Sequence, residues 1–163
     1  MSKEYRYNTY EEAMEAVGKY WREIKHVQPD LQTPEMVMML VEWDVWAFEH
    51  VRPDLQTPEM AEMAVKGGLW VLEFVRKDLI TPEMAEMAVK GHGSNLRYVP
   101  EHIITPEMAE MAVKDWGYNI KYVPTHLQTQ EVIEIALKQD PGNSKYIKIK
   151  EMFKNALEEA LDE

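Results

Sequence analysis

The sequence contains no cysteine, and its 18 lysines and arginines are outnumbered by 29 aspartates and glutamates. The lack of cysteine excludes disulfides, thiolate metal sites and a cysteine nucleophile. The formal net charge of -11 argues against direct binding of nucleic acid, because Lys and Arg supply most phosphate contacts. No apolar run approaches the roughly 20 residues of a membrane span, and the first ten residues lack the apolar stretch of a secretory signal. We therefore expect a cytoplasmic protein with neither a membrane nor a nucleic acid as its partner.

Catalytic and phosphate-binding motifs are also missing. The sequence contains no GxSxG nucleophile elbow, no GxxxxGK[ST] phosphate loop and no GxGxxG dinucleotide fingerprint. Its one glycine-rich stretch, Gly91–Ser94, fits none of these patterns. We predict a protein that is not an enzyme, has no catalytic residues and uses no cofactor.

What the sequence does contain is a repeat of 24 residues. The string TPEMAEMAVK begins at Thr57, at Thr81 and at Thr105. Counted from these threonines, the ninth position is valine in five repeats and leucine in the sixth. The same register, without insertions, gives six repeats that begin at Thr9, Thr33, Thr57, Thr81, Thr105 and Thr129. Such periodicity is typical of repeat architectures.

Each repeat predicts a helix followed by a turn and a shorter helix. Threonine before Pro-Glu is typical of an N-cap, with proline in the first helical position and a carboxylate near the positive end of the helix dipole. Positions four, eight and nine are apolar at helical spacing, as are positions 16, 19 and 23. Turn residues such as Gly91–Asn95 separate the two segments in the last three repeats. In the first three repeats this junction is only weakly broken, as in Trp43–Phe48.

A repeat of this length cannot bury two helices by itself, so neighbouring repeats must stack. The sequence therefore predicts an all-α fold, an α-solenoid of six helix–turn–short-helix repeats in a single domain spanning residues 1–163. Near the end of the chain Ile149, Phe153 and Leu157 lie on one face of a predicted helix. We expect this amphipathic segment, residues 149–162, to form a C-terminal capping helix.

The repeat resembles a known family. TPEMAEMAVK, a glycine-containing turn and the segment Leu96–Pro100 (LRYVP) are similar to a tandem α-helical repeat of uncharacterised bacterial, phage and large-virus proteins. Ile120–Pro124 (IKYVP) is closest to that family's LKYVP segment. The resemblance spans about residues 9–150, implies an α-solenoid and makes a phage origin one expectation. It implies no activity, because the family's function is unassigned. The first three repeats depart from the LKYVP form, so we expect longer, differently packed second helices there.

Histidines and glutamates recur at fixed positions of the repeat. His102 and His126 share position 22, but equivalent positions in neighbouring helices lie about 8–10 Å apart. Two ligands of one zinc ion must be much closer, because zinc–nitrogen bonds are about 2.1 Å long. We predict no metal site. A carboxylate stands at position three of every repeat, including Glu35, Glu59, Glu83, Glu107 and Glu131. Stabilisation of six helix N-termini is the simplest explanation of these glutamates.

Aromatic residues give the strongest functional signal. All five tryptophans fall at positions 11 to 14, where the repeats vary most. A variable edge on a fixed scaffold is typical of the binding surfaces of repeat proteins, and Trp and Tyr are frequent anchors of interfaces. The predicted partner-binding residues are Trp43, Trp46, Trp70, Trp116 and Tyr118. The alternative is that these rings fill gaps between first and second helices, with Trp46 packed on Trp70.

The sequence thus favours a non-enzymatic repeat scaffold for protein–protein interaction that binds a protein or peptide through its aromatic turn edge. The flanking residues Asp115, Gly117 and Asn119 favour exposure of Trp116 and Tyr118. The acidic surface favours a basic partner. The alternative is an acidic nucleic-acid mimic, such as a phage-type inhibitor that occupies the basic groove of a host nuclease or defence protein. In that alternative the position-three glutamates are the binding residues.

Overall fold

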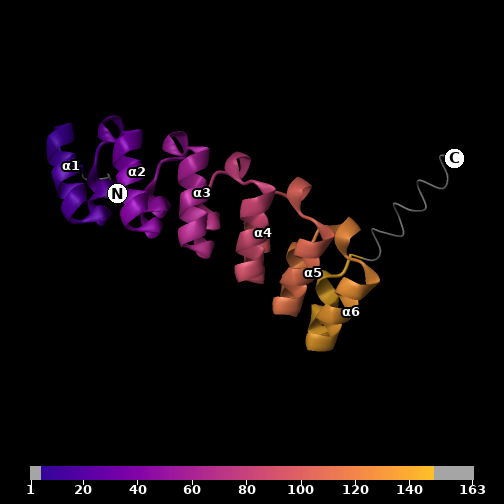
Figure 1. Ribbon diagram of the computed structural model, residues 1–163. Helices are drawn as coiled ribbons and strands as arrows, with labels where there is room; N and C mark the ends of the chain where they lie inside the picture. Colours follow the sequence, from indigo (N-terminus) through magenta and orange to yellow (C-terminus); the bar gives the residue numbers. More distant parts are fainter. Residues whose placement is uncertain (1–4, 149–163) are drawn as a thin grey trace. The chain divides into compact units, whose positions relative to one another are not determined.

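The computed structural model describes residues 5–148, which contain helices and turns but no strand. An α-helix of ten residues begins directly after each repeat threonine (Figure 1). These helices are α1 (Tyr10–Lys19), α2 (Pro34–Trp43), α3 (Pro58–Gly67), α4 (Pro82–Gly91), α5 (Pro106–Asp115) and α6 (Gln130–Gln139). The predicted all-α repeat fold is confirmed.

The second segment of every repeat is a 3₁₀ helix of six residues. These segments are η1 (Trp21–His26), η3 (Val45–His50), η5 (Leu69–Phe74), η7 (Gly93–Tyr98), η9 (Gly117–Tyr122) and η11 (Pro141–Tyr146). A three-residue 3₁₀ turn then leads to the next repeat in η2 (Pro29–Leu31), η4 (Pro53–Leu55), η6 (Lys77–Leu79), η8 (Glu101–Ile103) and η10 (Thr125–Leu127). The expectation of longer second helices in the first three repeats is wrong. Because 3₁₀ helices have poorer hydrogen-bond geometry, they are stable only as short pieces.

The predicted threonine caps are confirmed in all six α-helices. The hydroxyl of Thr105, for example, accepts a hydrogen bond from the N–H of Met108 (3.2 Å), and the other five threonines do the same three residues on. Four of the six helices, α2 to α5, also have proline at the first helical position. These N-caps fix where each repeat begins.

Each α-helix ends without a left-handed residue. The residue after the helix is extended, as in His92 (φ -157°) and Trp116 (φ -153°), and its N–H still donates to the fourth carbonyl back. No residue in the described part of the chain has a positive φ. The backbone conformation of these turns therefore does not require glycine. Where glycine is required, the cause must be close packing.

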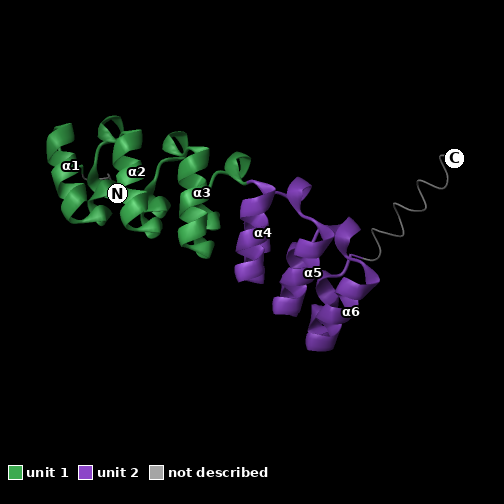
Figure 2. Ribbon diagram, viewed as in Figure 1, with its two compact units in different colours: residues 1–80 green, residues 81–163 purple. Residues whose placement is uncertain are grey.

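The chain divides at a repeat boundary into two compact units (Figure 2). Unit 1, Met1–Ile80, contains the first three repeats, and unit 2, Thr81–Glu163, contains the remaining three. Within each unit, neighbouring α-helices pack side by side in one layer and neighbouring six-residue 3₁₀ helices pack in a second. This is the stacking that a solenoid requires. The division leaves the single six-repeat domain as a prediction.

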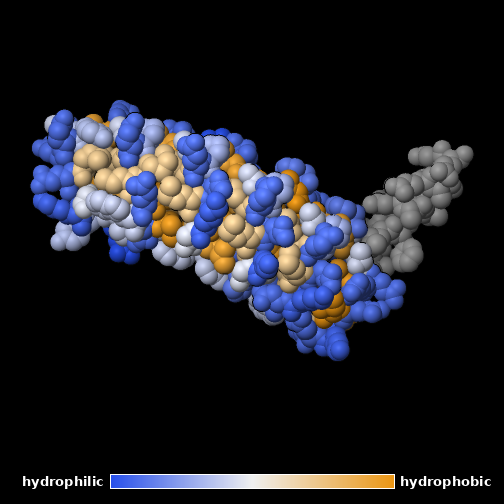
Figure 3. All heavy atoms as spheres, viewed as in Figure 1, coloured by the Kyte–Doolittle hydropathy of each residue, from blue (hydrophilic) through white to orange (hydrophobic). Residues whose placement is uncertain are grey.

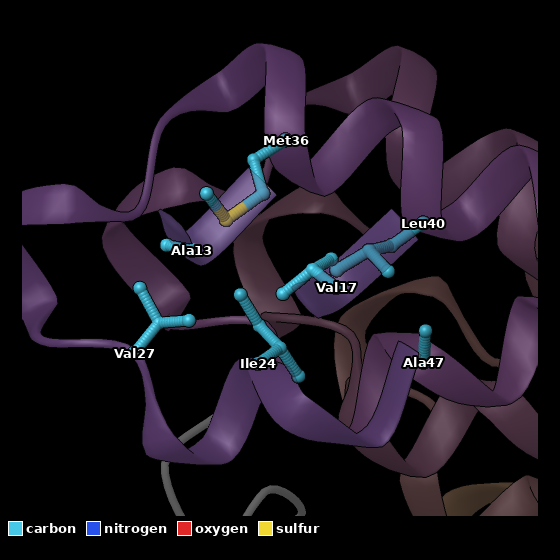
Figure 4. Close-up of a cluster of buried hydrophobic side chains, with 7 residues drawn as sticks. All are labelled: Ala13, Val17, Ile24, Val27, Met36, Leu40 and Ala47. Atoms are coloured by element: carbon cyan, nitrogen blue, oxygen red, sulfur yellow. The ribbon is translucent and has the colours of Figure 1, made fainter. Parts of the chain in front are cut away.

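The core of each unit lies between the two layers. In unit 1 a cluster of fully buried side chains points inward from α1, η1, α2 and η3 (Figure 4). It consists of Ala13, Val17, Ile24, Val27, Met36, Leu40 and Ala47. In unit 2 the equivalent positions are buried too, with alanines in α4 to α6 and Leu96 and Ile120 in the 3₁₀ layer. The apolar positions predicted from the periodicity thus form the core.

Polar side chains connect the repeats of unit 1. The side chain of Gln56 is buried; it donates to the carbonyl of Phe74 (2.8 Å) and accepts from the N–H of Arg76 (2.8 Å). Arg76 also donates to the carbonyl of Pro53, and Arg52 makes the same contact to Pro29 one repeat earlier. Since these contacts reach back about one repeat, they fix the register between neighbouring repeats.

Unit 2 has a matching buried glutamine, Gln128, which donates to the carbonyl of Tyr146 (3.2 Å) and accepts from the N–H of Lys148 (2.9 Å). Unit 2 also has buried asparagines and glycines in its turns. Asn95, Asn119 and Asn143 each donate to the carbonyl seven residues earlier, at the end of their own α-helix (2.9–3.0 Å). A Cβ on Gly93 would lie 2.8 Å from the Cα and the carbonyl oxygen of Ala112. Glycine is therefore required there because η7 approaches the backbone of α5 so closely. From the sequence, these residue types predicted only an ordinary turn.

The predicted capping helix over 149–162 lies outside the described residues. It stays a prediction.

Replacing glycine by alanine should have opposite effects at two positions. Gly93→Ala should destabilise the protein by about 1–3 kcal/mol, because the new methyl group meets backbone atoms that cannot move aside. Gly18→Ala, inside α1, should stabilise it by about 0.5–1 kcal/mol, because its nearest atom is an ordinary contact at 3.9 Å and alanine favours helix. Urea denaturation followed by circular dichroism measures both. Equal destabilisation by the two variants would contradict the packing explanation.

Candidate functional site

Three tryptophans lie on the turn edge of unit 1, where α-helices pass into 3₁₀ helices. The exposed fractions are 59% for Trp43, 45% for Trp46 and 42% for Trp70. Trp43 ends α2, Trp46 is the second residue of η3 and Trp70 is the second residue of η5. We call these three residues the aromatic edge of unit 1. These exposed fractions leave part of each indole accessible to a partner.

Local contacts hold this edge in place. The carboxylate of Asp44 accepts a hydrogen bond from the N–H of Trp46 (3.0 Å) and so caps η3. A Cβ on Gly67 would lie only 2.3 Å from a methyl carbon of Val45, so the two turns are in direct contact. Because Val45 takes up the inner space, the neighbouring indoles are left at the surface.

Not every aromatic residue at these positions is available to a partner. Trp21 is partly buried against the core of unit 1, and its ring lies 5.7 Å from that of His50. Tyr20, in contrast, is exposed in the turn after α1. It occupies repeat position 12, which is Asp44 in the second repeat. Exposure in this turn therefore differs between adjacent positions, and an aromatic residue in the turn is not by itself an accessible one.

In unit 2 the aromatic rings contact one another. Trp116 is 54% exposed and lies with its ring 4.8 Å from that of Tyr118. Tyr118 is only half exposed, and it meets Tyr146 of the next repeat edge to face at 5.1 Å. The ammonium of Lys121 is 3.7 Å from the Tyr118 ring centre, and its hydrogen bond to the hydroxyl lowers the pKa of Tyr118. Trp116 is the accessible member of this group.

The polar flanks of Trp116 and Tyr118 do not behave as expected. Gly117 and Asn119 are buried, although their residue types predicted an exposed turn. Asn119 donates to the carbonyl of Ala112 (2.9 Å), and the N–H of Gly117 donates to Gln139 of the next repeat (2.7 Å). Trp116 is exposed as expected, but Gly117 and Asn119 are not the reason, because the buried helix end needs a hydrogen-bond donor.

The position-three glutamates are exposed, in agreement with a place on the first turn of each helix. For Glu35, Glu83 and Glu107 the pKa is lowered, first by a hydrogen bond from the residue's own backbone N–H and then by the hydroxyl of the capping threonine. A carboxylate at this place also complements the helix dipole. Local stabilisation of helix ends therefore accounts for these three.

Residues 5–148 offer no group of histidine and carboxylate side chains that could hold a metal ion. His102 and His126 are exposed on separate 3₁₀ turns. Among the described helices, none is long and apolar enough to cross a membrane. Unit 1 has two open hollows of about 560 Å³, but side chains of both charge signs line them, among them Arg6, Glu12 and Lys19 in the first and Lys25 and Glu49 in the second. Neither hollow gathers groups with a shared chemistry.

Comparison with protein-family models, with curated proteins and with solved structures finds no match to this chain. The family resemblance of its repeats therefore stays a prediction.

The lowered pKa values of Glu83 and Glu107 predict a pH effect on stability. A carboxyl group whose pKa is lower in the folded state stabilises the protein above its ordinary pKa, about 4.3, and loses this effect as pH falls through the folded value. The melting temperature of the wild type should therefore fall more steeply between about pH 5 and pH 3 than that of E83Q/E107Q. Glu86→Gln, in the middle of α4, is the control. Parallel curves for wild type and double variant would refute the explanation.

Proposed function

We propose that this protein is a non-enzymatic scaffold that binds another protein or a peptide through its aromatic turn edge. The observation that supports this is the exposure of the three indoles of the aromatic edge of unit 1, each between 42% and 59%. Large exposed apolar groups that lie together commonly mark interaction surfaces. Tryptophan is also among the residues most enriched at the energetic centres of interfaces.

The scaffold suits such a role because it limits the entropy that binding must remove. Asp44 fixes the start of η3, and Val45 packs on Gly67, so the backbone that carries Trp46 is already ordered. An indole has only two side-chain torsions to fix when a partner covers it. Pre-ordered aromatic anchors give more affinity per contact than flexible ones.

Unit 2 would contribute a second contact through Trp116. Its stacking on Tyr118, which Tyr146 and Lys121 support, holds the indole in one orientation. In this proposal Tyr118 positions Trp116 and contributes less contact area of its own.

The alternative, an acidic mimic of nucleic acid, is less well supported. The carboxylates of Glu35, Glu83 and Glu107 already accept hydrogen bonds from their own backbone and from a capping threonine. Those interactions give these glutamates a role that needs no partner. Our proposal retains the cytoplasm as the place of action.

The test is a selection of peptides from a random library on the immobilised wild-type protein. The affinity of the selected peptides should fall by about 30-fold or more in W46S/W70S, which corresponds to the roughly 2 kcal/mol of an interface hot spot. Since both side chains are largely at the surface, circular dichroism should show an unchanged fold.

E83Q/E107Q is the matched control and should bind as the wild type does. Binding should change little between low and high salt, because apolar contacts are not screened. Failure to select any peptide, or equal affinity for wild type and W46S/W70S, would refute the proposal. Binding that depends on the two glutamates and disappears at high salt would favour the mimic instead.

A further inference from the structure

A third hollow of unit 1 differs in chemistry from the other two. It is an open groove of about 450 Å³ between α2 and α3. Its floor is formed by Met38, Met39 and Met60, and carboxylates stand at Glu35, Glu42 and Glu59. No cation lines it. We call it the methionine groove. Over the α-helices of unit 1, Figure 3 shows hydrophobic spheres gathered between hydrophilic ones.

The groove results from two departures of α2 from the repeat. In α3 to α6 the sixth and tenth repeat positions are glutamate and lysine, which face each other one turn apart. In α3 these residues form an ion pair, Glu62 with Lys66, at 2.5 Å. In α2 the same positions are Met38 and Glu42. An ion pair with no net charge is thereby replaced by the apolar side chain of Met38 and the exposed carboxylate of Glu42, which has no partner among the described residues.

The charge around the groove selects the kind of partner. Three carboxylates around a methionine floor attract cations and repel anions. Methionine side chains are flexible and polarisable, and they adapt to apolar groups of different shape. A ligand that satisfies both features must have apolar side chains on one face and lysine or arginine beside them.

The groove also adjoins the aromatic edge. Met39 and Trp43 are four residues apart in α2 and so lie on the same face of that helix. Trp43 is the most exposed of the five tryptophans, and a Cβ on Gly18 of α1 would lie 3.9 Å from its indole. A partner that runs along α2 from the groove therefore meets Trp43 one helical turn beyond Met39.

We infer that the methionine groove binds a basic amphipathic peptide segment, such as a helix with leucine-like side chains on one face and lysine or arginine next to them. The inference rests on the proposed function in one respect, that the partner is a protein or peptide. It adds a second surface and the chemistry of the ligand. The ligand's cations would lie near Glu35, Glu42 and Glu59, and its apolar side chains on Met38 and Met39.

The probe is a labelled helical peptide of leucine and lysine, about 14 residues long, with leucines on one face. Fluorescence anisotropy measures its affinity. M38E/E42K restores the residue types of the other repeats and should weaken binding by about tenfold or more. This variant should fold normally, because Glu62 and Lys66 form that same pair in α3. Circular dichroism and the melting temperature check the fold.

Three controls separate the groove from general attraction to an acidic protein. E131Q, in α6, changes the net charge by the same single unit as M38E/E42K and should bind like the wild type. A serine–lysine peptide of equal charge should bind at least about tenfold more weakly than the leucine–lysine peptide. E86M/K90E gives α4 the residues that α2 has at the sixth and tenth positions, while Met87 and Glu107 already match Met39 and Glu59. This variant should bind two peptides per protein molecule in place of one.

Equal affinity of wild type and M38E/E42K would overturn the inference. So would a serine–lysine peptide that binds as tightly as the leucine–lysine peptide, or no second bound peptide in E86M/K90E. W46S/W70S should bind the leucine–lysine peptide with the affinity of the wild type, since neither tryptophan lines the groove. The groove is thus tested by M38E/E42K and the aromatic edge by W46S/W70S, so one proposal can be refuted without the other.

Discussion

The close approach of neighbouring repeats at alanine is the constraint on which unit 2 depends. The carbonyl of Ala112 accepts one hydrogen bond from the N–H of Trp116 and another from the side chain of Asn119. Gly93 of the preceding repeat lies against the backbone of the same alanine. A larger side chain at any of these places would separate the layers and leave a helix end without its donor. The fourth and fifth repeats meet the constraint in the same way, because Ala88, Gly93 and Asn95 recur 24 residues later as Ala112, Gly117 and Asn119.

The two units meet this constraint with different side chains. Unit 1 has Ala47 and Val71 where unit 2 has buried asparagines. At the far end of the 3₁₀ helix the units agree, because Gln56 in unit 1 and Gln128 in unit 2 make the same bridge between neighbouring repeats. With apolar residues inside the turn, the indoles of unit 1 remain outside. Unit 2 has small and polar residues inside, and its exposed Trp116 rests on Tyr118. The indoles are thus exposed with either kind of inner turn residue.

The features that could be predicted from the sequence are those that depend on local and periodic patterns. The threonine caps and the apolar positions depend on neighbours within one turn of helix, so the pattern at Thr105 or Val113 was sufficient. The nature of the second helix was not predictable, because Ile120 and Val123 are spaced for either helical type. Asn119 looked like a turn residue, since nothing in its sequence neighbourhood reveals that a helix end is buried beside it. The methionine groove was not predicted, because periodicity draws attention to the shared positions, whereas Met38 is a departure from the glutamate that α3 to α6 have at its position.

The binding chemistry of such a protein resides in its departures from the repeat. Core positions such as Ala64 and Val65 are fully buried and must stay as they are to preserve stacking. The sixth and tenth positions face outward, and an exposed ion pair like Glu62–Lys66 contributes little to stability. Exchanging that pair for Met38 and Glu42 therefore costs the fold little, yet it changes a neutral surface into an apolar and acidic one. Because each α-helix presents these two positions separately, one repeat can acquire a ligand while the others keep the scaffold intact.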